Sequence, residues 1–175
     1  MKYTYLIITI ITLFSCQKND PKAIQQVKQW QGKEIYFPDS LTSRIMGKDT
    51  SCTELFNKDY KILVFVDSTD CTECKLQLYE WSKLINNSQQ YNDKLSIIFI
   101  IHTPNPKNID IICKKNKFNY PLFYDKKNIT NTLNHFPKEI EFQTFLLDKN
   151  NHVIIIGNPI KNTKMWNLYM KIISQ

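Results

Sequence analysis

Cys71 and Cys74 are the two residues whose type and spacing most directly allow chemistry. Two thiols with only Thr72 and Glu73 between them can close into a disulfide and reopen by exchange with another thiol. They come shortly after an apolar run at residues 61–66 and begin a helical pattern. Because the first amides of a helix lack internal partners and carry the positive end of its dipole, they would stabilise a thiolate at Cys71. We therefore predict that Cys71 attacks a disulfide and that Cys74 resolves the mixed disulfide.

The other three cysteines give different predictions. Cys113 lies on the apolar face of a predicted helix, so we expect it to be a buried small hydrophobe. Cys52 lies in a polar stretch, and we expect it to be exposed. An extra thiol in an exported protein could form a mixed disulfide, but an inert thiol is the favoured interpretation. The irregular spacing of the five cysteines does not fit a disulfide scaffold.

The first fifteen residues have the layout of an export signal. Lys2 precedes an apolar stretch, residues 5–14, which is shorter than the about 20 residues that span a bilayer. The sequence Leu13-Phe14-Ser15-Cys16 resembles the lipobox of bacterial lipoproteins. This resemblance implies a signal peptide over 1–15, a lipidated Cys16 with a tether over 16–32, and one domain over 33–175. An unprocessed N-terminal helix with an incidental cysteine is the alternative.

Strand and helix patterns alternate around the dithiol. Continuous apolar runs predict buried strands, and clusters of Pro, Gly, Asn and Asp separate them. The predicted strands cover 34–37, 61–66, 95–101, 122–124, 144–147 and 153–156, and residues 41–46 are expected to pair with the first of them. The helical patterns are a linker or short helix over 21–30, and helices from about 71 to 87, from about 108, over 128–133, and after Asn162. The strands over 61–66 and 95–101 are joined through a helix and should be parallel, whereas residues 148–151 predict a hairpin.

Three of these helices carry an apolar stripe at helical spacing, which indicates the side that packs on the sheet. The stripes are Cys74, Leu78, Trp81 and Ile85; Ile109, Ile112 and Cys113; and Met165, Leu168, Tyr169 and Ile172. The whole pattern predicts a single α/β domain in which helices cover both faces of a central mixed sheet.

Residues 64–75 resemble the active-site stretch of the thioredoxin-like superfamily, and residues 144–157 resemble the closing hairpin of its membrane-anchored, redoxin-type (TlpA/ResA-like) lipoproteins. The resemblance implies a three-layer fold and thiol–disulfide exchange at Cys71 and Cys74 without a cofactor. It further implies that exported proteins with disulfides are substrates, that a partner protein supplies electrons, and that a lipid anchor holds the chain in the bacterial cell envelope. Because Gln17 is not an aspartate, the lipobox resemblance favours the outer membrane, facing the periplasm or the cell surface.

The chain departs from the family pattern at three places. Asp70 stands where an aromatic residue is usual, and Thr72-Glu73 stands where Gly-Pro is common. Acidic neighbours disfavour a thiolate, which suits a more reducing couple. The family's cis-proline position falls at about Phe142, and the chain has no proline there.

These departures leave other functions open. A structural disulfide on a non-catalytic binding module is one alternative. A copper-binding chaperone is another, with His102 or His135 joining the two cysteines. Peroxidase chemistry has the least support, because Val64 and Ser68 stand where a peroxiredoxin has proline and threonine.

The overall composition excludes some other functions. The formal net charge is +7, but the lysines are spread along the chain and form no basic run, so nucleic-acid binding is not expected. With only three glycines, the chain cannot build a Gly-rich phosphate loop.

Overall fold

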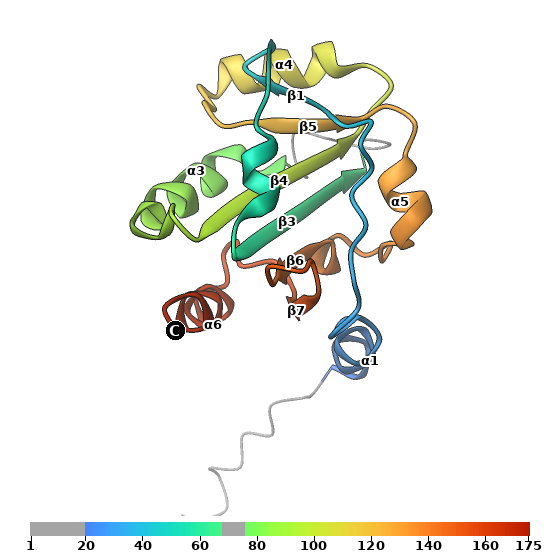
Figure 1. Cartoon of the computed structure of the whole chain (residues 1–175), viewed down its shortest axis with the longest axis vertical. Helices are drawn as coiled ribbons and strands as arrows, with labels where there is room; N and C mark the ends of the chain where they lie inside the picture. Colours follow the sequence, from blue (N-terminus) through green and yellow to red (C-terminus); the bar gives the residue numbers. More distant parts are fainter. Residues whose placement is uncertain (1–19, 68–75) are drawn as a thin grey trace, which may run out of the picture.

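The computed structural model describes residues 20–67 and 76–175. Their strands form one sheet in the order β2-β1-β5-β4-β3-β6-β7 (Figure 1). The strands are β1 (Thr42–Ile45), β2 (Lys48–Thr50), β3 (Tyr60–Asp67), β4 (Leu95–His102), β5 (Leu122–Asp125), β6 (Thr144–Leu147) and β7 (Val153–Ile156). The helices described are α1 (Pro21–Trp30), α3 (Leu78–Asn87), α4 (Pro106–Lys115), α5 (Ile129–Asn134) and α6 (Thr163–Ile173), with short 3-10 helices η2 (Thr53–Asn57), η3 (Gln89–Tyr91) and η4 (Ile140–Phe142).

The two longest strands, β3 and β4, lie at the centre of the sheet and pair in parallel, as predicted. Their apolar residues are buried on both faces, which is why both sequences read as almost continuous hydrophobic runs. The register places Asp67 beside His102 and His102 beside Asp125. The carboxyl ends of β3, β4 and β5 therefore meet at one edge of the sheet.

Each face of the sheet carries its own hydrophobic core. On one face, α3, α4 and α6 pack through Trp81, Cys113 and Tyr169. On the other face, α1 and η2 pack together with Phe136, which follows α5. This arrangement confirms the predicted α/β architecture with helices on both faces.

The predicted strand over 34–37 is wrong. Glu34 makes only an isolated bridge to His152, and the chain then leaves the sheet. The side chain of Asn134 replaces the missing strand partner: it accepts from the Tyr36 amide at 2.9 Å and donates to the Tyr36 carbonyl at 2.8 Å. Residues 42–45 form β1 instead, which pairs with β2 on one side and with β5 on the other. A tight turn joins β1 to β2, and in it Met46 and Gly47 both have positive φ.

In α4 and α6, the side of the helix that packs on the sheet differs slightly from the predicted side. Leu168 is exposed, whereas Tyr169 and Ile173 are fully buried, so α6 packs through a stripe one position further along. In α4, Ile109 and Cys113 are buried as predicted, but Asp110 rather than Ile112 completes the buried face. A prediction based on apolar residues alone could not place Asp110 on the buried face, because its side chain is polar.

Helix α1 confirms the helical alternative for residues 21–30. Asp20 caps it by accepting from the Lys22 amide at 2.9 Å, and Pro21 takes the first helical position. Trp30 at its end is buried against Phe136 and Phe145, so the packed part of the chain includes residues before 33. Across residues 20–67 and 76–175, every helix is too short or too polar to cross a bilayer.

Asp125 begins α5 by accepting hydrogen bonds from the amides of Thr130 at 2.6 Å and Ile129 at 3.0 Å. Burial raises the pKa of Asp125, but these donors outweigh it, and the pKa lies below its ordinary value. A lowered pKa stabilises the fold above the unfolded-state value of about 4, and this stabilisation is lost as the pH falls through the folded-state value.

We therefore expect Asp125→Asn to lower the free energy of unfolding by about 1–2 kcal/mol at pH 7, because a neutral amide accepts these hydrogen bonds less strongly. The difference from the natural protein should shrink below about pH 4. Urea unfolding at pH 7, 5 and 3 measures it. Asp93→Asn, at an exposed site, is the control and should change stability by less than about 0.5 kcal/mol at each pH. A difference for Asp125→Asn that is constant with pH would contradict this account.

Candidate active site

The predicted site residues Cys71 and Cys74, and the predicted lipidation site Cys16, lie outside the described residues. The described chain fixes what flanks the dithiol segment. Before it, β3 ends at Asp67 in the middle of the sheet; after it, Leu76 is buried in the core that α3 covers. The segment is therefore joined to the carboxyl edge of the two central strands, where open α/β sheets commonly place functional residues.

A carboxylate and an imidazole meet at this edge. Asp67 Oδ1 and His102 Nδ1 are 3.1 Å apart, and both side chains are partly exposed, at 30% and 20%. The parallel register makes the two residues neighbours across the strands. Asp67 is four residues from Cys71, so its Cα lies within about 14 Å of the Cα of that cysteine. Such a pair can accept, hold and release a proton, which thiol–disulfide exchange requires.

The residue directly before β6 is Gln143, one position after the expected Phe142. Its carbonyl accepts from the Phe65 amide at 2.9 Å, which brings it against the end of β3. Its side-chain amide turns inward and donates to the Pro137 carbonyl at 2.8 Å. Within the described ranges no peptide bond is cis. At the position where the family has a cis-proline, this chain therefore has a trans peptide and the buried side chain of Gln143. Phe142 packs against the core that contains Trp30.

The two histidines of the copper alternative occupy different elements. His102 ends β4 and pairs with Asp67, whereas His135 follows α5 in a left-handed conformation with φ of 58°. No group of three His, Cys, Asp or Glu side chains suited to a metal ion occurs among residues 20–67 and 76–175. The copper alternative depends on Cys71 and Cys74 and stays a prediction.

Cys52 and Cys113 are both buried free thiols. The expectation that Cys52 is exposed is wrong: its exposed fraction is 8%, and its sulfur lies 3.6 Å from Thr50 Oγ1. The expectation for Cys113 is confirmed, because it is 2% exposed on the face of α4 that packs on the core. Burial, with a smaller contribution from the neighbouring Asp110, raises the pKa of Cys113 to about 12.

We expect Cys113 to resist alkylation by iodoacetamide in the folded protein at pH 8, because the reactive form is the thiolate and burial suppresses it. Mass spectrometry of peptides labelled before and after unfolding in urea measures the modification. Labelling should become complete only in urea. The exposed variant Ile111→Cys, placed on the same helix in a Cys113→Ala background, is the positive control because Ile111 is 63% exposed. Equal labelling of both cysteines in the folded state would contradict the prediction.

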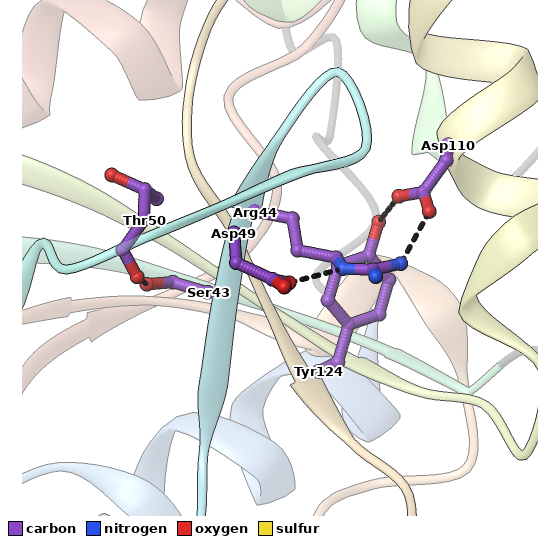
Figure 2. Close-up of polar contacts among 6 residues, drawn as sticks. All are labelled: Ser43, Arg44, Asp49, Thr50, Asp110 and Tyr124. Carbon is purple, nitrogen blue, oxygen red and sulfur yellow. Dashed lines mark hydrogen bonds and ion pairs between the residues drawn. The ribbon is translucent and has the colours of Figure 1, made fainter.

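A buried carboxylate that sequence reasoning missed joins β1, β5 and α4. Asp110 binds the Arg44 guanidinium through Oδ2 at 2.5 Å and accepts from the Tyr124 hydroxyl through Oδ1 at 2.9 Å (Figure 2). Arg44 also pairs with the exposed Asp49 at 2.8 Å. Burial and the bond to Asp110 raise the pKa of Tyr124, so its hydroxyl remains a donor. The signal in the sequence was the position of Asp110, between Ile109 and Cys113 on one helical face.

An open groove of about 1170 Å³ lies beside β1 and β2. Its lining combines aromatic rings with side chains of both charges, among them Tyr36, Phe37, Phe56, Phe123, Lys107, Lys126, Glu34, Asp39 and Asp49. Lys107 follows β4 and Lys126 follows β5, so one end of the groove lies near the sheet edge that carries the Asp67–His102 pair.

Comparisons with known proteins agree with this architecture. A family model described as the AhpC/TSA family matches residues 20–156. A search of curated protein sequences finds no significant match. Among solved structures, a protein from Chlorobium tepidum assigned as thiol:disulfide interchange protein DsbE is similar with a TM-score of 0.59 and 11% identity, covering 82% of this chain and 98% of that chain.

Two further structures from Bacteroides show the same likeness. The thioredoxin domain of a thiol-disulfide oxidoreductase from Bacteroides vulgatus aligns with a TM-score of 0.58 and 13% identity, covering 82% of this chain and 97% of that chain. A protein from Bacteroides thetaiotaomicron assigned as a protein disulfide isomerase aligns with a TM-score of 0.55 and 19% identity, covering 81% and 87%. At these identities the likeness shows the fold, and the thioredoxin-like fold predicted from the sequence is confirmed.

Proposed function

Because the chain belongs to the AhpC/TSA family, we propose that it is a thiol–disulfide oxidoreductase that acts through Cys71 and Cys74. Family membership and the thioredoxin-like fold support an oxidoreductase activity. The observation that carries the finer proposal is the place of the dithiol in the chain. Two cysteines with the spacing needed for exchange follow, in the sequence, the central strand β3, which ends at Asp67, the partner of His102.

The proposed reaction has two exchange steps. The thiolate of Cys71 attacks one sulfur of a substrate disulfide, which forms a mixed disulfide and releases the other substrate sulfur as a thiolate. The thiolate of Cys74 then attacks the Cys71 sulfur and releases the second substrate thiol. Two electrons pass to the substrate, and Cys71 and Cys74 end as a disulfide. The dithiol of a partner protein returns the two electrons, so no organic cofactor is needed.

The Asp67–His102 pair has a role in this scheme. Each exchange step consumes one thiolate and produces another, so protons must leave one thiol and reach the next. A partly exposed carboxylate hydrogen-bonded to an imidazole can accept a proton from Cys74 and pass it to solvent. The two side chains keep contact with water, which supports exchange of the proton with the surroundings.

We propose a location for this activity as well. The leader over 1–15 and the lipobox-like sequence ending at Cys16 support export and attachment to a membrane of the cell envelope, most simply the outer membrane. The substrates would be exported proteins with disulfides, and the groove beside β1 offers space for a segment of such a chain.

The reduction potential of the Cys71–Cys74 pair tests the proposal. The chain without residues 1–16 is equilibrated with glutathione mixtures of graded potential, and the free thiols are then trapped by alkylation and counted. We expect a value between about −120 and −270 mV, the range of known exchange catalysts. A value below about −300 mV, typical of an inert structural disulfide, would favour the non-catalytic binding module instead.

A further inference from the structure

Helix α1 is held to the domain by one side only. Trp30 packs against Phe136 and Phe145 with ring-centroid distances of 5.9 and 5.0 Å, and the Lys33 ammonium lies 4.0 Å from the centre of the Trp30 ring. Ile24 and Val27 are three residues apart and share a face, and each is 43% exposed. The end of α1 is therefore anchored in the core, while an apolar part of its surface faces outward.

The charges on α1 are all of one sign. Lys22 and Lys28 are exposed, and residues 21–30 contain no acidic residue. Asp20 is engaged as the helix cap through the Lys22 amide. Lys28 lies one turn after Ile24 on the flank of this apolar face, whereas Lys22 projects from the other side of the helix. Exposed aliphatic residues beside a lysine have the chemistry of a segment that lies in the interface of an anionic bilayer.

The length of chain before α1 determines how far it can be from a membrane. Only residues 17–19 separate Cys16 from Asp20. Four peptide steps reach at most about 14 Å between the Cα atoms. If Cys16 carries acyl chains in the outer layer of lipid, the first turn of α1 cannot leave the neighbourhood of the headgroups.

We propose that α1 lies against the lipid surface, with Ile24 and Val27 in contact with the acyl boundary and Lys28 near the phosphates. This inference rests on the lipidation of Cys16 that forms part of the proposed function. It gives the domain a fixed orientation. In Figure 1, α1 lies below the sheet, and the arrowheads of β3 and β4 point up and to the right, away from the apolar helix end that the lower part of the picture shows. The proposed contact face and the carboxyl ends of the central strands are therefore separate parts of the surface.

The lipidated full chain, purified from membranes and reconstituted into phosphatidylethanolamine–phosphatidylglycerol vesicles with brominated acyl chains, tests this orientation. Val27→Trp adds an indole to the proposed contact face, and Leu168→Trp adds one to α6. The two positions are matched, since Val27 is 43% and Leu168 is 45% exposed. We expect brominated lipid to quench the added fluorescence of Val27→Trp and to leave that of Leu168→Trp unchanged, because an interfacial helix sits about 5–10 Å into the boundary.

Charge neutralisation provides a second measurement. A lysine near an anionic surface should change the ratio of docked to undocked helix about fivefold, so Lys28→Gln should reduce quenching of Val27→Trp. If Val27→Trp and Leu168→Trp are quenched equally little while mass spectrometry shows an acylated Cys16, the docking is refuted and the anchor stands. If Cys16 carries no lipid, the proposed anchoring fails and this inference falls with it. Dimers in detergent that protect α1, without quenching in vesicles, would assign the face to a second copy and refute the lipid contact.

Discussion

Cys71→Ser is expected to abolish disulfide reduction, with a loss of at least about a thousandfold, because the change removes the sulfur nucleophile on which both exchange steps depend. Cys74→Ser should behave differently. The first step can still occur, but no thiol resolves the product, so a mixed disulfide between Cys71 and the substrate should accumulate. Turbidity or fluorescence assays of disulfide reduction measure the rate, and non-reducing mass spectrometry detects the trapped adduct.

Cys52→Ser is the matched control for these variants. It makes the same atomic change at a buried free thiol outside the proposed site. The rate of reduction should stay within about twofold of the natural protein, because no exchange step uses this sulfur. Activity that survives in Cys71→Ser but is lost in Cys52→Ser would show that the reactive thiol has been wrongly assigned.

Asp110→Ala is expected to lower the free energy of unfolding by about 3 kcal/mol, the largest stability effect that we predict for a polar side chain. Asp110 is 6% exposed and satisfies both the Arg44 guanidinium and the buried Tyr124 hydroxyl. Without it, the hydroxyl stays buried with no acceptor, and β1 loses its polar link to α4. Urea unfolding at pH 7, followed by circular dichroism, measures the change.

Asp49→Ala separates the effect of burial from the loss of an ion pair. Asp49 binds the same arginine at 2.8 Å, but its side chain is 84% exposed. Solvent screens such a pair, so its removal should cost less than about 1 kcal/mol. Similar losses for Asp110→Ala and Asp49→Ala would mean that the buried network contributes little beyond a surface ion pair.

The parts of the fold that the sequence predicted are those whose physical cause is local. β3 and β4 are continuous apolar runs because both of their faces are covered, and no helical reading fits so short an uninterrupted run. The hairpin of β6 and β7 has the bounds predicted from its Asp-Lys-Asn-Asn turn. The last helix begins after Asn162 as predicted, and Asn162 caps it through the Met165 amide, since capping depends on a residue and its own next turn.

The parts that could not be predicted depend on partners far away in the chain. Tyr36 has the residue type of a strand, but its backbone pairs with a side chain 98 positions later. Cys52 lies in a polar stretch, yet η2 and the sheet bury it. Asp110 looks like a surface residue until Arg44 and Tyr124 are placed beside it. No pattern within one element contains these contacts.

In the candidate site, too, the features with a local cause could be predicted from the sequence, and those that depend on distant residues could not. The type, spacing and place of Cys71 and Cys74 in the chain are readable from the sequence, and so is their position after β3. The pairing of Asp67 with His102 was not readable, because it depends on the parallel register of two strands 35 residues apart. From the sequence, His102 was named only as a possible copper ligand, and only the register shows that Asp67 lies beside it.

The path of residues 32–45 has a consequence for the order in which this chain can fold. Gly32 and Ile35 bond to the hairpin at one side of the sheet, Tyr36 is held by Asn134, and Arg44 lies in β1 toward the other side. All of these partners except β2 are synthesised much later than the segment itself. Residues 32–36 must therefore wait, unpaired, until the last hairpin has formed, and the domain cannot complete its folding stepwise from the N-terminus during synthesis. A chain that cannot fold until its last hairpin is synthesised stays unfolded long enough to be exported through a narrow membrane channel before it folds.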